Sequence, residues 1–211
     1  MKVQPLGSTH RQTFWEGVHA DRGVHGVSWW QHVPELSLEL IESAGLGADD
    51  PIIDVGSGWS TLVDHLLERG HRDVTAIDLS SNALQAVRDR LGRTRDDVVL
   101  EVADVLELNQ GRRYALWHDR ALFHFLTEQA DRDAYRASLE RSLGSWAWAV
   151  VATFGPDGPD RCSGLPVLRY THEDLAAEFP GFELVARSGE QHHTPWGSTQ
   201  QFTAVLLRRQ S

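Results

Sequence analysis

From residue 51 onward, short apolar segments alternate with segments in which apolar residues recur at helical spacing. The apolar segments cover 51–55, 73–79, 98–103, 113–117 and 146–154. Segments of this length bounded by turn residues are typical of strands. Serine or glycine marks several ends of the intervening segments, as in helix caps. Because strands that alternate with helices form a parallel sheet with crossover helices, the sequence predicts an α/β fold.

Two further strands are predicted near the end of the chain, at 182–187 and 201–208, joined by a polar loop. A loop rich in glycine and proline covers 155–166, and a short helix is predicted over 171–178. No segment has the composition of a linker, and 211 residues are enough for one large hydrophobic core. We therefore expect a single domain.

The composition excludes several classes of protein. No apolar run approaches the ~20 residues that a membrane helix needs, and residues 1–10 lack the apolar core of a signal peptide. The formal charge of −10 argues against nonspecific binding to nucleic acid, which needs a basic surface. Cys162 is the only cysteine and Lys2 the only lysine, so an internal disulfide and a lysine-dependent phosphate loop are excluded. A cytoplasmic location is expected.

The first predicted strand leads into a glycine-rich turn, Asp54-Val55-Gly56-Ser57-Gly58. Ligands of parallel sheets bind at this end of the strands, and glycines let the backbone turn tightly and approach a ligand. A dinucleotide site would favour a third glycine where this chain has Thr61, and Asp54 would repel a pyrophosphate. The turn therefore favours a positively charged ligand over NAD.

An acidic residue also ends each of the next two predicted strands. Asp78 lies at about the distance along the chain at which an acid binds both ribose hydroxyls. Asp104 and Val105 offer a side chain and a backbone amide that can bind an adenine edge. Any one of these acids is better explained as a loop cap or a solvated residue. Three in succession favour a nucleoside that carries a positive charge, as S-adenosylmethionine does.

These motifs match, in order and spacing, the cofactor motifs of class I methyltransferases, and the chain resembles that family over roughly its whole length. The resemblance implies an α/β three-layer sandwich, with a seven-stranded, mostly parallel sheet, an antiparallel last strand and helices on both faces. It implies a methyltransferase domain over 1–211, with a helical lid segment at 1–45 and a Rossmann-like core at 50–211. The predicted cofactor-binding residues are Trp30, Asp54, Gly56, Gly58, Asp78, Leu79, Asp104 and Val105.

Two other stretches look like a bacterial subgroup distantly similar to thiopurine and tellurite methyltransferases. One is the stretch 117–126, and the other combines 14–16 with 27–31. The second stretch also resembles the entry segment of some protein-lysine methyltransferases, which keeps a protein substrate open as an alternative. Trp29 and Trp30 are candidates for a lid, because aromatic side chains can close a pocket and lie against a sulfonium.

Three predicted loops share the sheet edge that faces the cofactor methyl, and they supply the candidate substrate site. Histidine can take a proton near neutral pH, and an aspartate can orient such a base. The predicted catalytic residues are Asp119, His193 and His118. The predicted substrate-binding residues are Trp29, His124, Cys162, His192 and Trp196. A metal site made from His118, His192, His193 and Asp119 is conceivable but is not predicted, because these residues lack the tight spacing of a ligand motif.

The sequence predicts methyl transfer from S-adenosylmethionine to a small soluble nucleophile, with sulfur, oxygen, nitrogen or a heavier chalcogen as the acceptor atom. A protein-lysine methyltransferase and a non-catalytic adenosylmethionine-binding module are the alternatives. The expected partner is a small-molecule substrate, with no nucleic acid and no membrane. The protein is expected to be a monomer or a weak homodimer.

Overall fold

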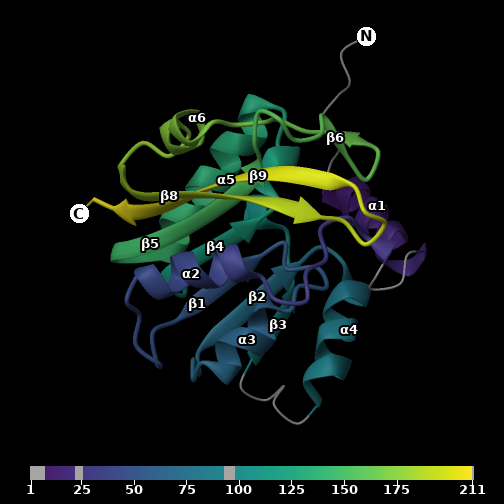
Figure 1. Ribbon diagram of the computed structural model, residues 1–211. Helices are drawn as coiled ribbons and strands as arrows, with labels where there is room; N and C mark the ends of the chain where they lie inside the picture. Colours follow the sequence, from purple (N-terminus) through teal and green to yellow (C-terminus); the bar gives the residue numbers. More distant parts are fainter. Residues whose placement is uncertain (1–7, 22–25, 93–97, 211) are drawn as a thin grey trace.

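The computed structural model describes residues 8–21, 26–92 and 98–210. A seven-stranded sheet runs through the molecule in the order β3-β2-β1-β4-β5-β9-β8 (Figure 1). Its strands are β1 (Ile52–Val55), β2 (Val74–Asp78), β3 (Val98–Val102), β4 (Tyr114–Arg120), β5 (Leu143–Phe154), β8 (Phe182–His193) and β9 (Thr199–Arg209). The first five strands pair in parallel, whereas β9 pairs antiparallel with both β5 and β8. The predicted sheet, with its antiparallel last strand, is confirmed.

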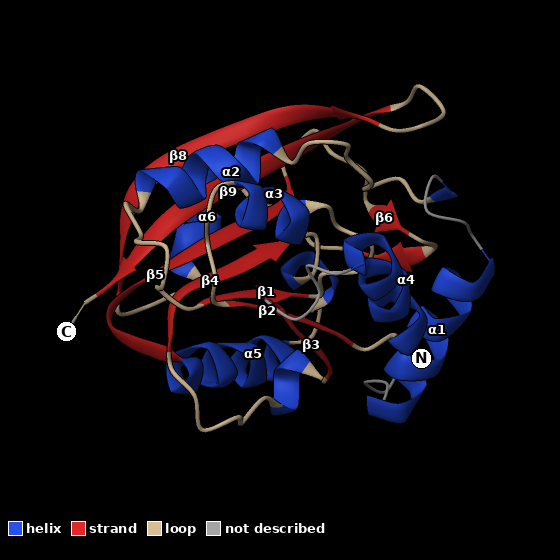
Figure 2. Cartoon of the chain, turned by 90° about the horizontal axis from the view of Figure 1, so that it is seen from below, coloured by secondary structure: helices blue, strands red, loops and turns tan. Residues whose placement is uncertain are grey.

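Helices cover both faces of this sheet, because neighbouring residues of each buried strand point to opposite sides. Ile52 belongs to a core cluster with α2 (Glu35–Ser43), α3 (Leu62–Glu68) and α4 (Ser81–Leu91). Its neighbour Ile53 belongs to the opposite cluster, with α5 (Gln129–Ser142) and α6 (His172–Ala177). Figure 2 shows α5 across the sheet from α2 and α3. The predicted three-layer arrangement is confirmed.

The remaining elements are short or lie at the chain's start. They are α1 (Ser8–Asp21), the 3₁₀ turns η3 (Val105–Glu107) and η4 (Phe123–Phe125), and the hairpin of β6 (Arg161–Cys162) and β7 (Leu165–Pro166). Within the described residues, the two helices of the predicted lid segment, 1–45, pack against different parts of the molecule. α2 buries Leu36 and Ile41 against the sheet, whereas α1 packs beside α4.

Two strands are longer than the sequence predicts. β4 continues to Arg120, because it pairs with β1 on one side and β5 on the other through Asp119. β8 continues to His193, because β9 pairs with it over its whole length. Polar side chains near both strand ends conceal this pairing in the sequence. His118, Asp119, His192 and His193 therefore lie in strands, where loops were predicted.

Asp119 joins β4 to α5 in the core. It is fully buried, and its Oδ1 accepts hydrogen bonds from the backbone N–H groups of Leu122 at 3.0 Å and Phe123 at 3.3 Å. Its Oδ2 accepts from the Tyr135 hydroxyl at 2.7 Å, and that hydroxyl in turn accepts from the indole N–H of Trp117 at 2.8 Å. Burial raises the pKa of Asp119 to about 6, although these hydrogen bonds oppose the shift. The carboxylate shapes the turn after β4.

Replacing Asp119 by alanine should destabilise the fold. The change leaves buried donors of Leu122, Phe123 and Tyr135 without an acceptor, which costs about 1–3 kcal/mol for each such group. Asp119→Asn retains an oxygen for the two backbone donors and should lose less. Urea denaturation measures both losses. Unchanged stability in Asp119→Ala, together with lost activity, would instead support the catalytic role that the sequence predicts.

Candidate functional site

A cavity of about 1130 Å³ lies at the carboxyl ends of β1, β2 and β4 and beside the loop after β3. Side chains of α1 and of the segment 29–31 line its other side. All residues predicted to bind the cofactor lie on the cavity wall, namely Trp30, Asp54, Gly56, Gly58, Asp78, Leu79, Asp104 and Val105. The structure thus brings these residues to one place, and their binding roles stay predictions.

The turn after β1 needs both of its glycines. Gly56 and Gly58 have φ angles of 62° and 52°, in the left-handed region that side chains rarely adopt. A Cβ atom at Gly56 would overlap the side chain of Leu122, from the loop after β4, and would lie 3.0 Å from its Cβ. The two loops therefore pack directly together at the cavity wall.

A chain of three polar side chains crosses from α2 to β1 beneath the cavity. Asp54 and His118 are opposite each other in the β1–β4 register, and His118 Nδ1 donates to Asp54 Oδ1 at 2.7 Å. His118 Nε2 lies 2.8 Å from the hydroxyl of Ser37. The second oxygen, Asp54 Oδ2, is buried and has no hydrogen-bond partner among the described residues. A carboxylate oxygen in this position favours a cationic ligand.

Asp78 closes the glycine turn from β2. Its Oδ2 accepts from the Gly58 N–H and its Oδ1 from the Ser80 N–H, each at 2.8 Å. Burial raises the pKa of Asp78 to about 6, although these two hydrogen bonds lower it, and the nearby charge of Asp54 adds to the rise. Both carboxylate oxygens thus have backbone partners, and Asp78 holds the shape of the turn as well as facing the cavity.

Asp104 bonds to the N-terminal helix. Its Oδ1 accepts from the Leu106 N–H at 3.0 Å, and its Oδ2 pairs with the Arg11 guanidinium of α1 at 2.7 Å. The ion pair brings α1 over the region that the sequence assigns to adenine. Arg11 also lines the cavity.

Glu16 fixes α1 to the N-terminus of α4. Its carboxylate accepts from the Ser81 N–H and hydroxyl at 2.7 Å, from the Ser80 hydroxyl at 2.8 Å and from the Asn82 N–H at 3.3 Å. Burial acts to raise the pKa of Glu16, but the bonds from Ser81, Ser80 and Asn82 lower it to about 2. A carboxylate is also favoured there by the helix dipole. Glu16 belongs to the 14–16 stretch of the sequence, where its residue type alone does not predict this role.

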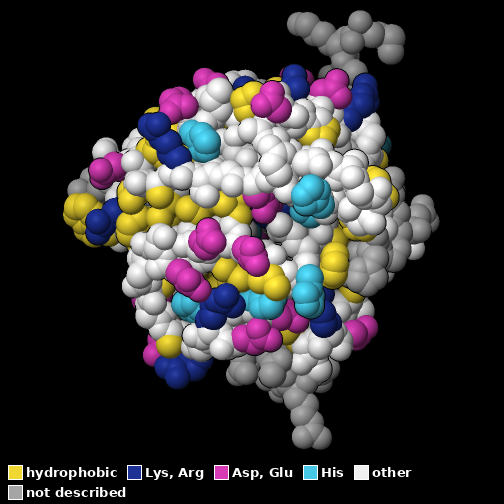
Figure 3. Space-filling view, viewed as in Figure 1, with side chains coloured by type: hydrophobic (Ala, Val, Ile, Leu, Met, Phe, Trp, Pro, Cys, Tyr) yellow, Lys and Arg dark blue, Asp and Glu magenta, His cyan; other side chains and the backbone are white. Residues whose placement is uncertain are grey.

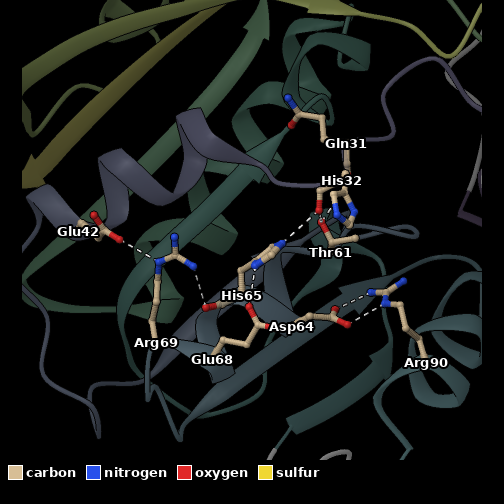
Figure 4. Close-up of polar contacts among 9 residues, drawn as sticks. All are labelled: Gln31, His32, Glu42, Thr61, Asp64, His65, Glu68, Arg69 and Arg90. Carbon is tan, nitrogen blue, oxygen red and sulfur yellow. Dashed lines mark hydrogen bonds and ion pairs between the residues drawn. The ribbon is translucent and has the colours of Figure 1, made fainter.

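The segment between α1 and α2 is held on both sides. Thr61 donates to the carbonyls of Gln31 and His32, and His65 donates from Nε2 to the His32 carbonyl at 3.1 Å (Figure 4). On the other side, Arg120 bonds to the Trp29 carbonyl at 3.1 Å. Arg120 also pairs at 2.6 Å with Glu190 of β8, which accepts from the Gln31 amide as well. These bonds place Trp29 and Trp30 at the cavity.

The predicted meeting of His118, Asp119 and His193 in one pocket is wrong. His118 lines the cavity, but Asp119 does not, because adjacent residues of a strand point to opposite faces. His193 is exposed on β8 opposite Thr199, outside the cavity wall. It lies apart because β8 is at the sheet edge, separated from β4 by β5 and β9.

Of the predicted substrate-binding residues, Trp29 lines the cavity and the other four do not. His124 is fully buried, accepts from the Phe154 N–H at Nδ1, and has its pKa lowered to about 3 by burial and by Arg120. Cys162 is buried in the β6–β7 hairpin. His192 donates to the Ser28 carbonyl at 2.6 Å, and Trp196 is 59% exposed in the β8–β9 turn. The hairpin instead contributes Arg161, Leu165 and Pro166 to the wall.

Aromatic residues form much of the cavity wall. They are Phe14, Trp15, Trp29, Trp30, Trp59 and Phe125. His19 of α1 lies among them, and its ring meets that of Trp59 edge to face at 4.6 Å. No role for His19 is predicted from the sequence, because nothing in the sequence of α1 indicates which of its sides faces the cavity. No group of three or more metal-ligating side chains occurs in the described parts of the chain.

Comparison with known proteins gives a family match for part of the chain. Residues 52–144, from β1 to the start of β5, match the family described as "Methyltransferase domain". Over 98 residues the chain is 34% identical to ribosomal RNA small subunit methyltransferase A of a Synechococcus strain, covering 44% of this chain and 35% of that protein. The chain thus spans about a third of the length of the curated relatives it matches.

Solved structures match the whole chain. A SAM-dependent methyltransferase from Anabaena variabilis is 17% identical, with a TM-score of 0.76 over 100% of this chain and 98% of that one. A 1,6-didemethyltoxoflavin-N1-methyltransferase from Burkholderia thailandensis, solved with 1,6-didemethyltoxoflavin and S-adenosylhomocysteine, is 19% identical. Its TM-score is 0.67 over 100% and 94% of the two chains. The chain therefore has the fold of S-adenosylmethionine-dependent methyltransferases, with its match to the methyltransferase domain over residues 52–144.

Proposed function

We propose that this chain transfers a methyl group from S-adenosylmethionine to a small soluble nucleophile. The observation that carries the proposal is Asp54 Oδ2, a buried carboxylate oxygen on the cavity wall without a partner among the described residues. Bound S-adenosylmethionine supplies a transferable methyl on a positively charged sulfur, next to an ammonium group. Asp54 offers a negative charge to such a ligand, and His118 keeps the carboxylate oriented.

The other wall residues fit the remaining parts of the cofactor. Ser57 has a buried hydroxyl without a hydrogen-bond partner among the described residues, beside Asp54 in the turn. Asp78 faces the cavity from β2, where it would accept from ribose hydroxyls. Asp104 and Val105 would hold adenine, with Leu79 packing beside them. The three side chains at the strand ends, Asp54, Asp78 and Asp104, are acidic, which suits a cationic nucleoside better than a phosphate.

The size of the cavity and the elements that enclose it support a small methyl acceptor. Ligand pockets commonly measure about 300–1,000 Å³, so a cavity of about 1130 Å³ has room for the cofactor and a second small molecule. α1 and the segment 29–31 enclose the side away from the strand ends. A protein side chain would have to enter past these elements, which disfavours the protein-lysine alternative. The subgroup likeness to thiopurine and tellurite methyltransferases remains part of this proposal.

The names of the curated relatives mention ribosomal RNA, but we do not propose RNA as the substrate of this chain. Acidic and basic side chains are interspersed over the face in Figure 3, and the chain has a formal charge of −10. RNA binding at its phosphates needs a concentrated basic surface. Within the described residues, each helix is too short or too polar to cross a membrane. A cytoplasmic monomer or weak homodimer acting on a small molecule is proposed.

Isothermal titration with S-adenosylmethionine, S-adenosylhomocysteine and NAD tests the proposal. Both adenosyl ligands should bind, and NAD should not, because the Asp54 carboxylate at the glycine turn would repel its pyrophosphate. A screen of small thiols, amines, phenols and oxyanions should then find an acceptor, read as S-adenosylhomocysteine formed. Binding of NAD alone would refute the proposed function.

Cofactor affinity should fall as the pH drops through about 6. The pKa of Asp78 is raised to about 6, so the carboxylate becomes protonated below that pH and no longer accepts freely from ribose hydroxyls. Each pH unit below the pKa of Asp78 should weaken cofactor binding roughly tenfold, until the protonation of another group also affects binding.

Titrations of S-adenosylhomocysteine at pH 7.5, 6.5 and 5.5 measure this dependence. The matched control is Asp78→Asn, whose amide does not titrate in this range. The variant should bind more weakly than wild type at pH 7.5 and change little with pH. Parallel pH slopes in the two proteins would assign the dependence to a different group.

A further inference from the structure

His19 is a buried polar side chain whose hydrogen bonding is incomplete. It is 6% exposed, and its Nδ1 atom is buried without a hydrogen-bond partner among the described residues. Such a nitrogen costs free energy unless a ligand or water satisfies it. Its ring lines the cavity and lies against the glycine turn, since a Cβ atom at Gly58 would be 3.6 Å from His19 Cε1.

The surroundings of His19 are aromatic. Trp15 and Trp29 each have their ring centroid 6.4 Å from the imidazole, and Trp15 meets Phe125 edge to face at 5.0 Å. We call the space bounded by Trp15, His19, Trp29 and Phe125 the aromatic chamber. Its aromatic members are only partly buried, so ring surface faces the cavity. Aromatic surfaces of this kind favour flat rings as partners.

The chamber carries no formal charge at neutral pH. Burial lowers the pKa of His19 to about 4, although the charge of Glu16 opposes the shift. The imidazole is therefore neutral, with one nitrogen available as an acceptor. The Glu16 carboxylate is turned to the N-terminus of α4, and Glu190 is paired with Arg120. The four side chains that bound the chamber offer no carboxylate to a cationic substrate group; the acidic wall residues Asp54, Glu128 and Asp131 are not among them.

On the basis of the proposed function, we infer that the methyl acceptor is a flat, uncharged ring compound with an N–H or O–H group that donates to His19. The aromatic rings hold the plane of the compound, and the hydrogen bond fixes its rotation within that plane. His19 is thereby a positioning residue that selects ring compounds carrying a donor. Cofactor affinity depends instead on the residues at the strand ends.

The test compares ring binding to the wild-type complex with S-adenosylhomocysteine. The probes are indole with 1-methylindole, and 2-naphthol with 2-methoxynaphthalene, each pair differing in a single donor. Cyclohexylamine serves as the cationic probe. Isothermal titration should show each donor-bearing ring binding roughly tenfold more tightly than its methylated counterpart, the size expected for one hydrogen bond in a buried site. Cyclohexylamine should bind more weakly than either parent ring.

Two substitutions separate hydrogen bonding from packing. His19→Phe keeps an aromatic ring but removes both nitrogens, so it should abolish the preference for the donor-bearing ring. His19→Asn loses the ring but keeps an oxygen acceptor, so it should retain part of that preference. His10→Ala, on the exposed side of the same helix, is the matched control and should behave as wild type. Affinity for S-adenosylhomocysteine should stay within about twofold in all three variants, since the strand-end residues are unchanged.

The outcomes distinguish this inference from the proposed function. Failure of wild type to bind S-adenosylhomocysteine in the first titration would overturn the proposed function. Normal binding of S-adenosylhomocysteine with equal affinity for each ring pair would overturn the role of His19 alone. The same holds if His19→Phe keeps the preference, or if cyclohexylamine binds more tightly than the rings.

Discussion

The hydrogen bond between Asp54 and His118 joins the two central strands at the point where the cavity begins. Both side chains are about 3% exposed, and they are opposite each other in the register of β1 and β4. Removing one partner of such a buried pair commonly costs about 3–5 kcal/mol, because the other is left uncompensated. Ser37 extends the chain to α2, so the position of Asp54 Oδ2 depends on a strand pairing and on the docking of a helix. Asp54 Oδ2, the one buried carboxylate oxygen without a hydrogen-bond partner among the described residues, is thus held by the core itself.

The fold and the strand-end residues were predictable because their signals are local. Gly56 and Gly58 are needed by their backbone conformation, and Asp78 and Asp104 directly follow apolar strands. In a parallel sheet, strand ends meet at one edge, so residues far apart in sequence come together without any further information. Hydrophobic patterning predicted the alternation of strands and helices, and the resemblance to class I methyltransferases implied the helices on both faces that the two core clusters confirm.

The acceptor side was not predictable in the same way. Which residues line the acceptor side depends on where β4 and β8 end. Polar residues such as Asp119 and His193 occupy paired strand positions there, and polar residues at a strand end predict a loop. Neighbouring residues of a strand point to opposite faces of the sheet, which is why His118 reaches the cavity and Asp119 does not. His19 and Glu16 depend on the docking of α1, a long-range contact with no repeated pattern in the sequence.

The attachment of α1 through Glu16 has a kinetic consequence. α1 supplies Arg11, Phe14, Trp15 and His19 to the cavity, so a movement of this helix would widen the cavity, and the helix is attached to α4 at its middle. Swinging it away exposes a carboxylate and leaves the first turn of α4 without its acceptor, and both must be rehydrated before the passage is clear. Opening of the cavity on the side of α1 therefore requires the undocking of a helix, the kind of step that limits turnover in enzymes where opening and not chemistry is slow.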